Sequence, residues 1–175
     1  NELESINAIA EELQAEIRAN FNEPTASVQA YNADALGGNA LSQEDTAKAI
    51  LEQAGLKTGL IGTTGSLIGE KRLDGTLTTP DPIDLQRDLR AMADEGVKAV
   101  VMEVSAHAID MFRLDGLSFE VGAYTNLSQD HLDYFGTMEM YRKAKEKFFS
   151  DFYLKHAVVN ADDEAAEHML GRVDA

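Results

Sequence analysis

Short apolar segments alternate with more polar segments from about residue 42 onward, and no other feature constrains the fold as strongly. The apolar segments have the length of strands and cover residues 56–61, 98–104, 119–125 and 157–160. The segments between them are predicted as helices and cover residues 42–54, 84–95, 138–150 and 162–170. Strands that alternate with helices are typical of α/β domains, so we expect a three-layer, mostly parallel sheet flanked by helices.

Local signals refine this prediction. Ser42 with Asp45 three residues later is a capping box that predicts a helix start, and Gly55 marks the end of that helix. The unbroken apolar run at 99–102 predicts a central strand that is buried on both faces. Parallel sheets bind ligands at the carboxyl ends of their strands, so polar residues that follow a strand are candidate site residues.

The first 46 residues have a different character. Apolar residues at spacings of three and four predict an amphipathic helix over residues 3–17. A short extended piece is expected at 27–31, followed by a loop that contains Gly37 and Gly38. This segment is Ala-rich and acidic.

Length and charge limit the possible functions. The chain has 175 residues, enough for a single domain over 1–175. Its formal net charge of −16 argues against nucleic acid or an anionic membrane as the main partner, because both bind Lys and Arg. Without cysteine it has neither disulfides nor thiolate sites, and no apolar run is long enough for a membrane span. A cytoplasmic location is expected.

A first polar cluster follows the apolar run at 99–102 and contains Glu103, Ser105 and His107. A carboxylate at the end of a buried strand is costly unless it is paired or binds a metal. Glu103 is therefore either a metal ligand or a strand-end acid in a salt bridge, and the residues alone leave both readings open.

A second polar cluster follows the strand expected at 119–125. Asp130, His131 and Asp133 lie within four positions and offer oxygen and imidazole ligands to a divalent cation. An ordinary polar surface loop is the alternative. Two such clusters after neighbouring strands favour a metal site more than either cluster alone.

Two further segments offer polar groups. Thr78 and Thr79 precede Pro80, so a fixed turn can direct two hydroxyls at a ligand, although a plain turn before a helix explains them equally well. In the helix expected at 138–150, Lys145 shares a face with Tyr141 because the two are four residues apart. Arg142 and Lys143 of this helix are interpreted as a solvated face.

Together these segments resemble the central, ATP-binding domain of the Mur ligases, and within that family the UDP-N-acetylmuramoyl-L-alanyl-D-glutamate ligases of the MurE type. The resemblance covers residues 49–163, with 47–170 in the family pattern, and rests on the order and spacing of several motifs. These motifs lie at residues 59–65, 78–81, 102–108, 126–136, 141–149 and 158–163. The resemblance implies the P-loop-type α/β fold of that domain.

The resemblance also implies an activity. Mur ligases join an acyl group to an amine: ATP phosphorylates a substrate carboxylate, and the amine then displaces phosphate. Magnesium neutralises the charge that develops during the transfer. The implied function is an ATP-dependent amide-bond (acid–amino acid) ligase of peptidoglycan precursor synthesis, with magnesium and ATP as cofactors and a UDP-N-acetylmuramoyl-peptide as substrate.

Individual residues match positions of the family motifs. Glu103 and His131 match magnesium ligands, and Lys145 matches a lysine that CO2 converts to a carbamate, which turns a cation into a possible metal ligand. The alternative, favoured here because the loop hydroxyl of the magnesium site is lost, is an unmodified Lys145 in a salt bridge with Glu103. These three are the expected catalytic residues. Residues expected to hold the muramoyl-peptide are Thr78, Thr79, Ser105 and Arg113.

The chain departs from the family pattern at several points. Ala106 stands where a second Ser is usual, and Met111 where Gln is common. The family's phosphate loop, Gly-Thr-Asn-Gly-Lys-Thr-Thr, corresponds here to residues 36–42, which contain no Lys. Gly37 and Gly38 could form a small anion-binding nest, although a plain turn is favoured.

Three interpretations follow. In the first, the chain is a Mur-ligase-like central domain that is inactive alone, because its phosphate loop is absent and the domains for the uridine nucleotide and the amino acid are missing. In the second, it is a noncatalytic or engineered scaffold domain with a replaced segment at 1–46. In the third, it is a ligase fragment that binds ATP weakly. The phosphate-loop region at 36–42 discriminates between them.

Overall fold

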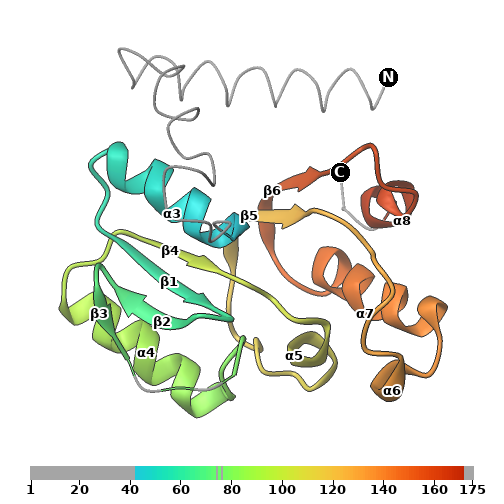
Figure 1. The fold of residues 1–175 in the computed structure, drawn as a ribbon, viewed down its shortest axis with the longest axis horizontal. Helices are drawn as coiled ribbons and strands as arrows, with labels where there is room; N and C mark the ends of the chain where they lie inside the picture. The colour runs from blue at the N-terminus through green and yellow to red at the C-terminus, as the bar shows by residue number, and fades with distance from the viewer. Residues whose placement is uncertain (1–41, 74, 76, 172–175) are drawn as a thin grey trace, which may run out of the picture. The chain divides into compact units, whose positions relative to one another are not determined.

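A computed structural model describes residues 42–73, 75 and 77–171, which form two compact units (Figure 1). The helix expected at 3–17, the extended piece at 27–31 and the Gly37–Gly38 pair lie outside the described residues. Of the described residues, one unit includes 42–73 and 89–102, and the other includes 75, 77–88 and 103–171. Among the described residues, no helix is long and apolar enough to cross a membrane.

The first unit contains a four-stranded sheet in the order β3-β2-β1-β4. Its strands are β1 (Thr58–Gly62), β2 (Gly65–Ile68), β3 (Lys71–Arg72) and β4 (Ala99–Met102). β1 pairs with β4 in parallel and with β2 antiparallel, and β2 pairs with β3 antiparallel. The sheet is therefore mixed.

Helices cover both faces of this sheet. Gly59 of β1 points toward Met92 of α4 (Pro82–Asp94), whereas Gly62 points toward Glu44 of α3 (Gln43–Gln53). Residues three apart in a strand face opposite sides, so α3 and the end of α4 lie on opposite faces of the sheet. Leu60, at 0% exposure, lies in the core of this unit.

The second unit is built on a two-stranded parallel sheet of β5 (Phe119–Tyr124) and β6 (Leu154–Val159). Its helices are α5 (Ala106–Asp110), α6 (Leu132–Phe135), α7 (Met138–Ser150) and α8 (Ala166–Leu170). α7 packs closely on the sheet, because a Cβ at Gly122 would lie 3.0 Å from the Phe148 ring. Phe119 and Phe152 extend this contact, with ring centroids 5.0 Å and 5.8 Å from that of Phe148.

Most predicted elements are confirmed. The helix at 138–150 has the predicted ends, and Ser42 caps α3, since its Oγ accepts the N–H of Asp45 at 3.1 Å. The expected helices at 84–95 and 162–170 correspond to α4 and α8, and the four expected strands to β1, β4, β5 and β6. The hairpin β2–β3 and the short helices α5 and α6 were not predicted.

Two expectations about the sheet need correction. The α/β class is confirmed, but the four-stranded sheet is mixed rather than mostly parallel, because β2 and β3 form an antiparallel hairpin beside β1. The run at 99–102 does form a strand, but within the described part of the chain β4 is the edge strand of its sheet. Val100 is accordingly 39% exposed instead of buried on both faces.

Candidate functional site

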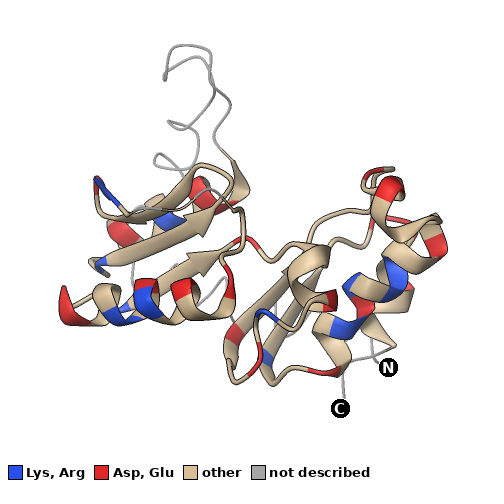
Figure 2. Ribbon diagram, turned by 90° about the horizontal axis from the view of Figure 1, so that it is seen from below, with Lys and Arg blue, Asp and Glu red and all other residues tan. Residues whose placement is uncertain are grey.

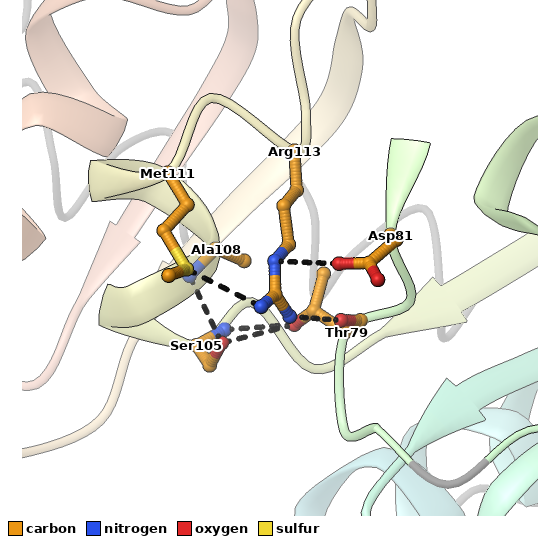
Figure 3. Close-up of polar contacts among 6 residues, drawn as sticks. All are labelled: Thr79, Asp81, Ser105, Ala108, Met111 and Arg113. Atoms are coloured by element: carbon orange, nitrogen blue, oxygen red, sulfur yellow. Dashed lines mark hydrogen bonds and ion pairs between the residues drawn. The ribbon is translucent and has the colours of Figure 1, made fainter. Parts of the chain in front are cut away.

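Thr79 lies at the centre of a polar cluster in the second unit (Figure 3). Its hydroxyl donates to the carbonyl oxygen of Glu103 at 2.8 Å and accepts the backbone N–H of Ser105 at 3.0 Å. The Oγ atoms of Thr79 and Ser105 lie 3.3 Å apart. Thr79 is 1% exposed, so its hydroxyl fixes the chain that follows β4 and is not open to solvent. Thr78, the preceding residue, is half-buried.

Arg113 binds the other side of this cluster. Its Nη1 donates to the carbonyl oxygen of Thr79 at 3.0 Å, and its Nε lies 3.2 Å from a carboxylate oxygen of Asp81. Its Nη2 contacts the sulfur of Met111 at 3.3 Å (Figure 3). Met111 is the residue that stands where the family pattern commonly has Gln. The Arg113 side chain is 16% exposed, so a mostly buried guanidinium faces the Thr79 turn.

Ser105 also begins α5. Its Oγ accepts the backbone N–H of Ala108 at 3.2 Å, which satisfies one of the free N–H groups at the helix start. Because the backbone of Ser105 is bonded to Thr79, the position of α5 depends on the Thr79 turn.

His131 lies among aromatic rings at the start of α6. Its ring meets the ring of His107 edge-on at 4.7 Å between centroids and the ring of Tyr141 edge-on at 5.8 Å. Its backbone is left-handed, with φ of 54°, and its N–H donates to Oδ1 of Asp130 at 2.8 Å.

Lys145 differs from the other cations of α7, whose basic residues are visible in Figure 2. Arg142, Lys143 and Lys147 pair with carboxylates, whereas the Nζ of Lys145 lies over the ring of Tyr141 at 5.3 Å from its centroid. Burial lowers the pKa of Lys145, and the negative charges of three carboxylates oppose this shift. These carboxylates belong to Glu103, Asp163 and Asp130.

The prediction of a solvated face for Arg142 is therefore wrong. Arg142 pairs with Glu146 one turn later, and Glu146 is only 4% exposed. Lys143 does lie on the exposed side, where it pairs with Glu139 at 2.7 Å.

Asp163 joins the ends of both strands in this unit. One of its carboxylate oxygens accepts the Tyr124 hydroxyl at 2.6 Å and the N–H of Ala165 at 2.9 Å, and the other accepts the N–H of Leu127 at 3.0 Å. These hydrogen bonds lower the pKa of Asp163. Burial and the bond to Asp163 together raise the pKa of Tyr124.

The predicted site residues thus form two groups in the second unit. Thr79, Ser105 and Arg113 are joined by hydrogen bonds, and His131 and Lys145 flank the ring of Tyr141. Glu103 connects the groups: its backbone is bonded to Thr79, and its carboxylate is close enough to affect the pKa of Lys145. Gly37 and Gly38 lie outside the described residues.

Sequence reasoning assigned no role to four residues of these groups, which are Asp81, His107, Tyr141 and Asp163, although it placed His107 in the first polar cluster and Tyr141 on the face of Lys145. Asp81 and Asp163 had a usable signal, because each occurs in a segment already recognised as a motif. Their partners are 32 and 39 positions away in the chain, and nothing in the local pattern indicates those contacts.

The donor set allows a limited test for a metal. No group of three His, Asp or Glu side chains in the described part of the chain is suited to hold a metal ion. Glu103 offers a carboxylate and His131 an imidazole, and both are ligand types that bind divalent cations. A further ligand is needed, and a carbamate on Lys145 would supply it.

Comparisons with known proteins bear on this site. The model of the Mur ligase middle domain matches residues 42–174. UDP-N-acetylmuramoyl-L-alanyl-D-glutamate–2,6-diaminopimelate ligases are similar in sequence, with 42% identity over 157 residues for Caldanaerobacter subterraneus subsp. tengcongensis and 46% over 127 residues for Clostridium perfringens. These alignments cover 89% and 73% of this chain, but only 32% and 26% of the relatives.

A solved structure with the same ligase name superposes with a TM-score of 0.63 at 36% identity. The match covers 70% of this chain and 24% of that one. The chain therefore spans between about a quarter and a third of the length of these relatives. The alignment that covers 89% of the chain is longer than residues 42–175, so it extends into the segment before residue 42. On the evidence of its motifs, its fold and these matches, the chain belongs to the Mur ligases, and residues 42–174 are its Mur ligase middle domain.

Proposed function

We propose that this chain is the middle domain of an ATP-dependent acid–amino acid ligase that acts on UDP-N-acetylmuramoyl-L-alanyl-D-glutamate in the cytoplasm. The relatives are named for the addition of 2,6-diaminopimelate. We propose that the enzyme to which this domain belongs adds the same amino acid. The observation that carries the proposal is the gathering of Thr79, Ser105, Arg113, His131 and Lys145 in one compact unit.

In this proposal the Arg113 group binds the anionic substrate. Arg113 offers a fixed guanidinium that suits a carboxylate or a phosphate, and the hydroxyls of Ser105 and Thr78 add donors beside it. Thr79, although predicted to bind substrate, supports the group through its buried bonds to Glu103 and Ser105. Asp81 holds the Arg113 side chain in place until substrate arrives.

Glu103, His131 and a carbamylated Lys145 would hold magnesium. When bound, the ion would neutralise negative charge on the phosphoryl group that is transferred. Burial supports carbamylation of Lys145, because a lowered pKa leaves more of the amine neutral and able to react with CO2. We also propose that residues 1–175 form a single α/β domain in which helices flank the strands, with β1–β4 and β5–β6 as its parallel pairs.

Nucleotide binding by the chain alone is expected to be weak. Residues 36–42 lack the lysine that would contact phosphate, and Ser42 uses its hydroxyl in the cap of α3. Loss of one charged contact to phosphate costs about 1.5–3 kcal/mol, or about one to two decades of affinity. We therefore propose that the isolated chain does not turn over substrate.

Calorimetric titration of the chain with UDP-N-acetylmuramoyl-L-alanyl-D-glutamate tests the proposal. Arg113→Gln should weaken binding at least tenfold, on the order of the 1.5–3 kcal/mol of a hydrogen bond to a charged group. Arg87→Gln is the matched control, since Arg87 is exposed on α4 and pairs only with Asp84 among the described residues. If the unaltered chain does not bind the substrate, or both variants bind equally, the proposed function is wrong.

A parallel titration with ATP and magnesium separates the alternatives. Weak ATP binding together with substrate binding would favour a ligase fragment. No binding of either ligand would favour a noncatalytic domain. Rebuilding Gly-Thr-Asn-Gly-Lys-Thr-Thr at residues 36–42 should restore nucleotide binding if the rest of the pocket is intact.

A further inference from the structure

His107 lies in the middle of a ring cluster that the proposed function does not use. Its ring centroid is 4.4 Å from that of Tyr134, 5.2 Å from that of Phe135 and 4.7 Å from that of His131. The first two contacts are tilted and the third is edge-on, at 84° between the ring planes. His107 therefore joins α5 to α6 at the point where His131 begins the second of these helices.

The strained backbone of His131 needs support from its surroundings, and the ring contact with His107 is part of these surroundings. A non-glycine residue in the left-handed region is strained, and such a conformation persists only where its surroundings determine it. The backbone carbonyl of His131 accepts the N–H groups of Tyr134 and Phe135, at 3.1 Å and 3.0 Å, and so opens α6. These bonds fix the backbone of His131. Its imidazole is held by its ring neighbours and by Asp130, whose Oδ2 lies 3.5 Å from Nε2 of His131.

Two rings flank that imidazole. His107 meets it on one side and Tyr141 on another, both edge-on. The ammonium of Lys145 lies over the Tyr141 ring, at 5.3 Å from its centroid. Because both side chains contact Tyr141, that ring determines how far His131 lies from Lys145. This holds only while the His131 ring remains in contact with Tyr141.

His107 is well supported for such a role. It is the second residue of α5, whose start is capped by Ser105, and Ser105 is bonded to the buried Thr79. On the other side, the hydroxyl of Tyr134 donates to Asp110 at 3.2 Å. Asp110 also accepts from Lys147 of α7 at 3.0 Å.

We propose that His107 is a positioning residue, whose ring holds the imidazole of His131 against Tyr141 beside Lys145. The inference rests on the proposed function in so far as His131 is taken as a metal ligand. His107 acts only through His131, by ring contact and not by proton transfer. A phenyl ring should therefore replace the imidazole of His107.

The first experiment needs no metal. The chain has only four histidines, so their ring signals can be resolved by NMR and assigned by substitution. The unaltered chain should show nuclear Overhauser effects between the rings of His131 and Tyr141. His107→Phe should keep these effects, and His107→Ala should lose them. His107→Leu, which fills the space without an aromatic edge, serves as a second variant if His107→Ala does not fold.

The second experiment uses Mn²⁺ as a paramagnetic probe of the metal site. Mn²⁺ should broaden the His131 ring signals at lower concentration than those of His156 and His168. His107→Ala should raise the concentration needed about tenfold, the usual effect of losing a residue that orients a metal ligand. His107→Phe should need less than about a twofold increase. Phe152→Ala is the matched control, because it removes a ring from the separate cluster around Phe148.

The outcomes separate this inference from the proposed function. If His107→Ala and His107→Leu both keep the effects between His131 and Tyr141, His107 does not position His131 and the inference is wrong, whatever Mn²⁺ does. If Mn²⁺ fails to broaden His131 in the unaltered chain, the metal role of His131 is wrong, and the ring effects alone decide whether His107 fixes its position. If Phe152→Ala shifts the Mn²⁺ response as much as His107→Ala does, the effect is one of general stability and the inference fails.

Discussion

Thr79 uses its hydroxyl inside the protein, and this explains why a polar residue is buried at a candidate binding site. The hydroxyl donates to the carbonyl oxygen of Glu103 and accepts the N–H of Ser105, two backbone groups that follow β4 directly. Both groups lose a partner if the hydroxyl is removed, and a buried group without a partner is costly. Thr79 therefore contributes to the site by fixing its backbone.

Replacing Thr79 separates its hydroxyl from its methyl group. Thr79→Val keeps the volume but removes both hydrogen bonds, and should lower the free energy of unfolding by about 2–3 kcal/mol. Thr79→Ser keeps the hydroxyl and loses one buried methyl, which should cost about 1 kcal/mol. Urea denaturation of both variants measures the difference. A Ser variant less stable than the Val variant would mean that packing, not hydrogen bonding, dominates at this position.

Asp163 should make stability depend on pH. Its pKa is lowered in the folded state from 3.8, so it stabilises the fold fully above that value. The stabilisation is lost as the pH falls below 3.8 toward the folded-state pKa, where the folded protein also takes up the proton. Asp163→Asn should therefore be less stable than the unaltered chain at pH 7, and the gap should close below about pH 4.

The measurement is the urea midpoint of both proteins from pH 3 to pH 7. Asp162→Asn is a suitable control, because Asp162 is the exposed neighbour and its one hydrogen bond among the described residues comes from its backbone N–H. A gap between Asp163→Asn and the unaltered chain that stays constant down to pH 3 would contradict the assigned role of the carboxylate.

At the scale of elements, α7 is held against β5 by the absence of a side chain at Gly122. A Cβ there would lie 2.7 Å and 3.1 Å from the two methyl carbons of Leu154, and 3.0 Å from the Phe148 ring. Contacts that short require the neighbours to move. The helix that carries Tyr141 and Lys145 thus approaches its sheet as closely as the backbone of Gly122 allows.

Gly122→Ala should accordingly lower the free energy of unfolding by about 1–3 kcal/mol, the usual cost of overpacking. Gly75→Ala is the matched control, since a Cβ at Gly75 meets nothing within 4 Å. Thermal or urea unfolding measures both changes. Equal stability of the two variants would show that α7 can move away from the sheet without loss.

Element length explains which parts of the fold the sequence predicts. α7 has 13 residues and an N-cap at Thr137, so its pattern defines both ends. β2 and β3 have four and two residues, and α5 and α6 have five and four, too few for a periodic pattern. The hairpin is what makes the sheet mixed, so missing it led to the wrong expectation about strand direction.

The site follows the same logic. Motif positions made Ser105, Arg113 and Lys145 candidate site residues, because residue type and spacing are visible in the sequence. They also made Thr79 a candidate for substrate binding, but they do not show that its hydroxyl faces two backbone groups of a segment 24 and 26 residues away. Contacts between distant segments, and not residue types, are what the sequence leaves open.

At the scale of the whole molecule, charge is the dominant property. The chain carries 31 acidic and 15 basic residues, and Figure 2 shows acidic positions on both units. Several of the bases are already used in exposed ion pairs, such as those of Arg87 with Asp84 and Lys143 with Glu139. Each exposed pair is worth only about 0–1 kcal/mol, so the excess of negative charge should outweigh them.

Salt should therefore stabilise this protein. Raising the salt concentration from 10 mM to 150 mM shortens the screening length from about 30 Å to about 8 Å, which weakens repulsion across the molecule more than attraction between paired neighbours. We expect the urea midpoint to rise over this range. The triple variant Asp115→Asn, Glu164→Gln, Glu167→Gln removes three exposed negative charges and should show a smaller rise. A midpoint that falls with salt in the unaltered chain would mean that its ion pairs outweigh the repulsion, and the net charge of −16 would then not control stability.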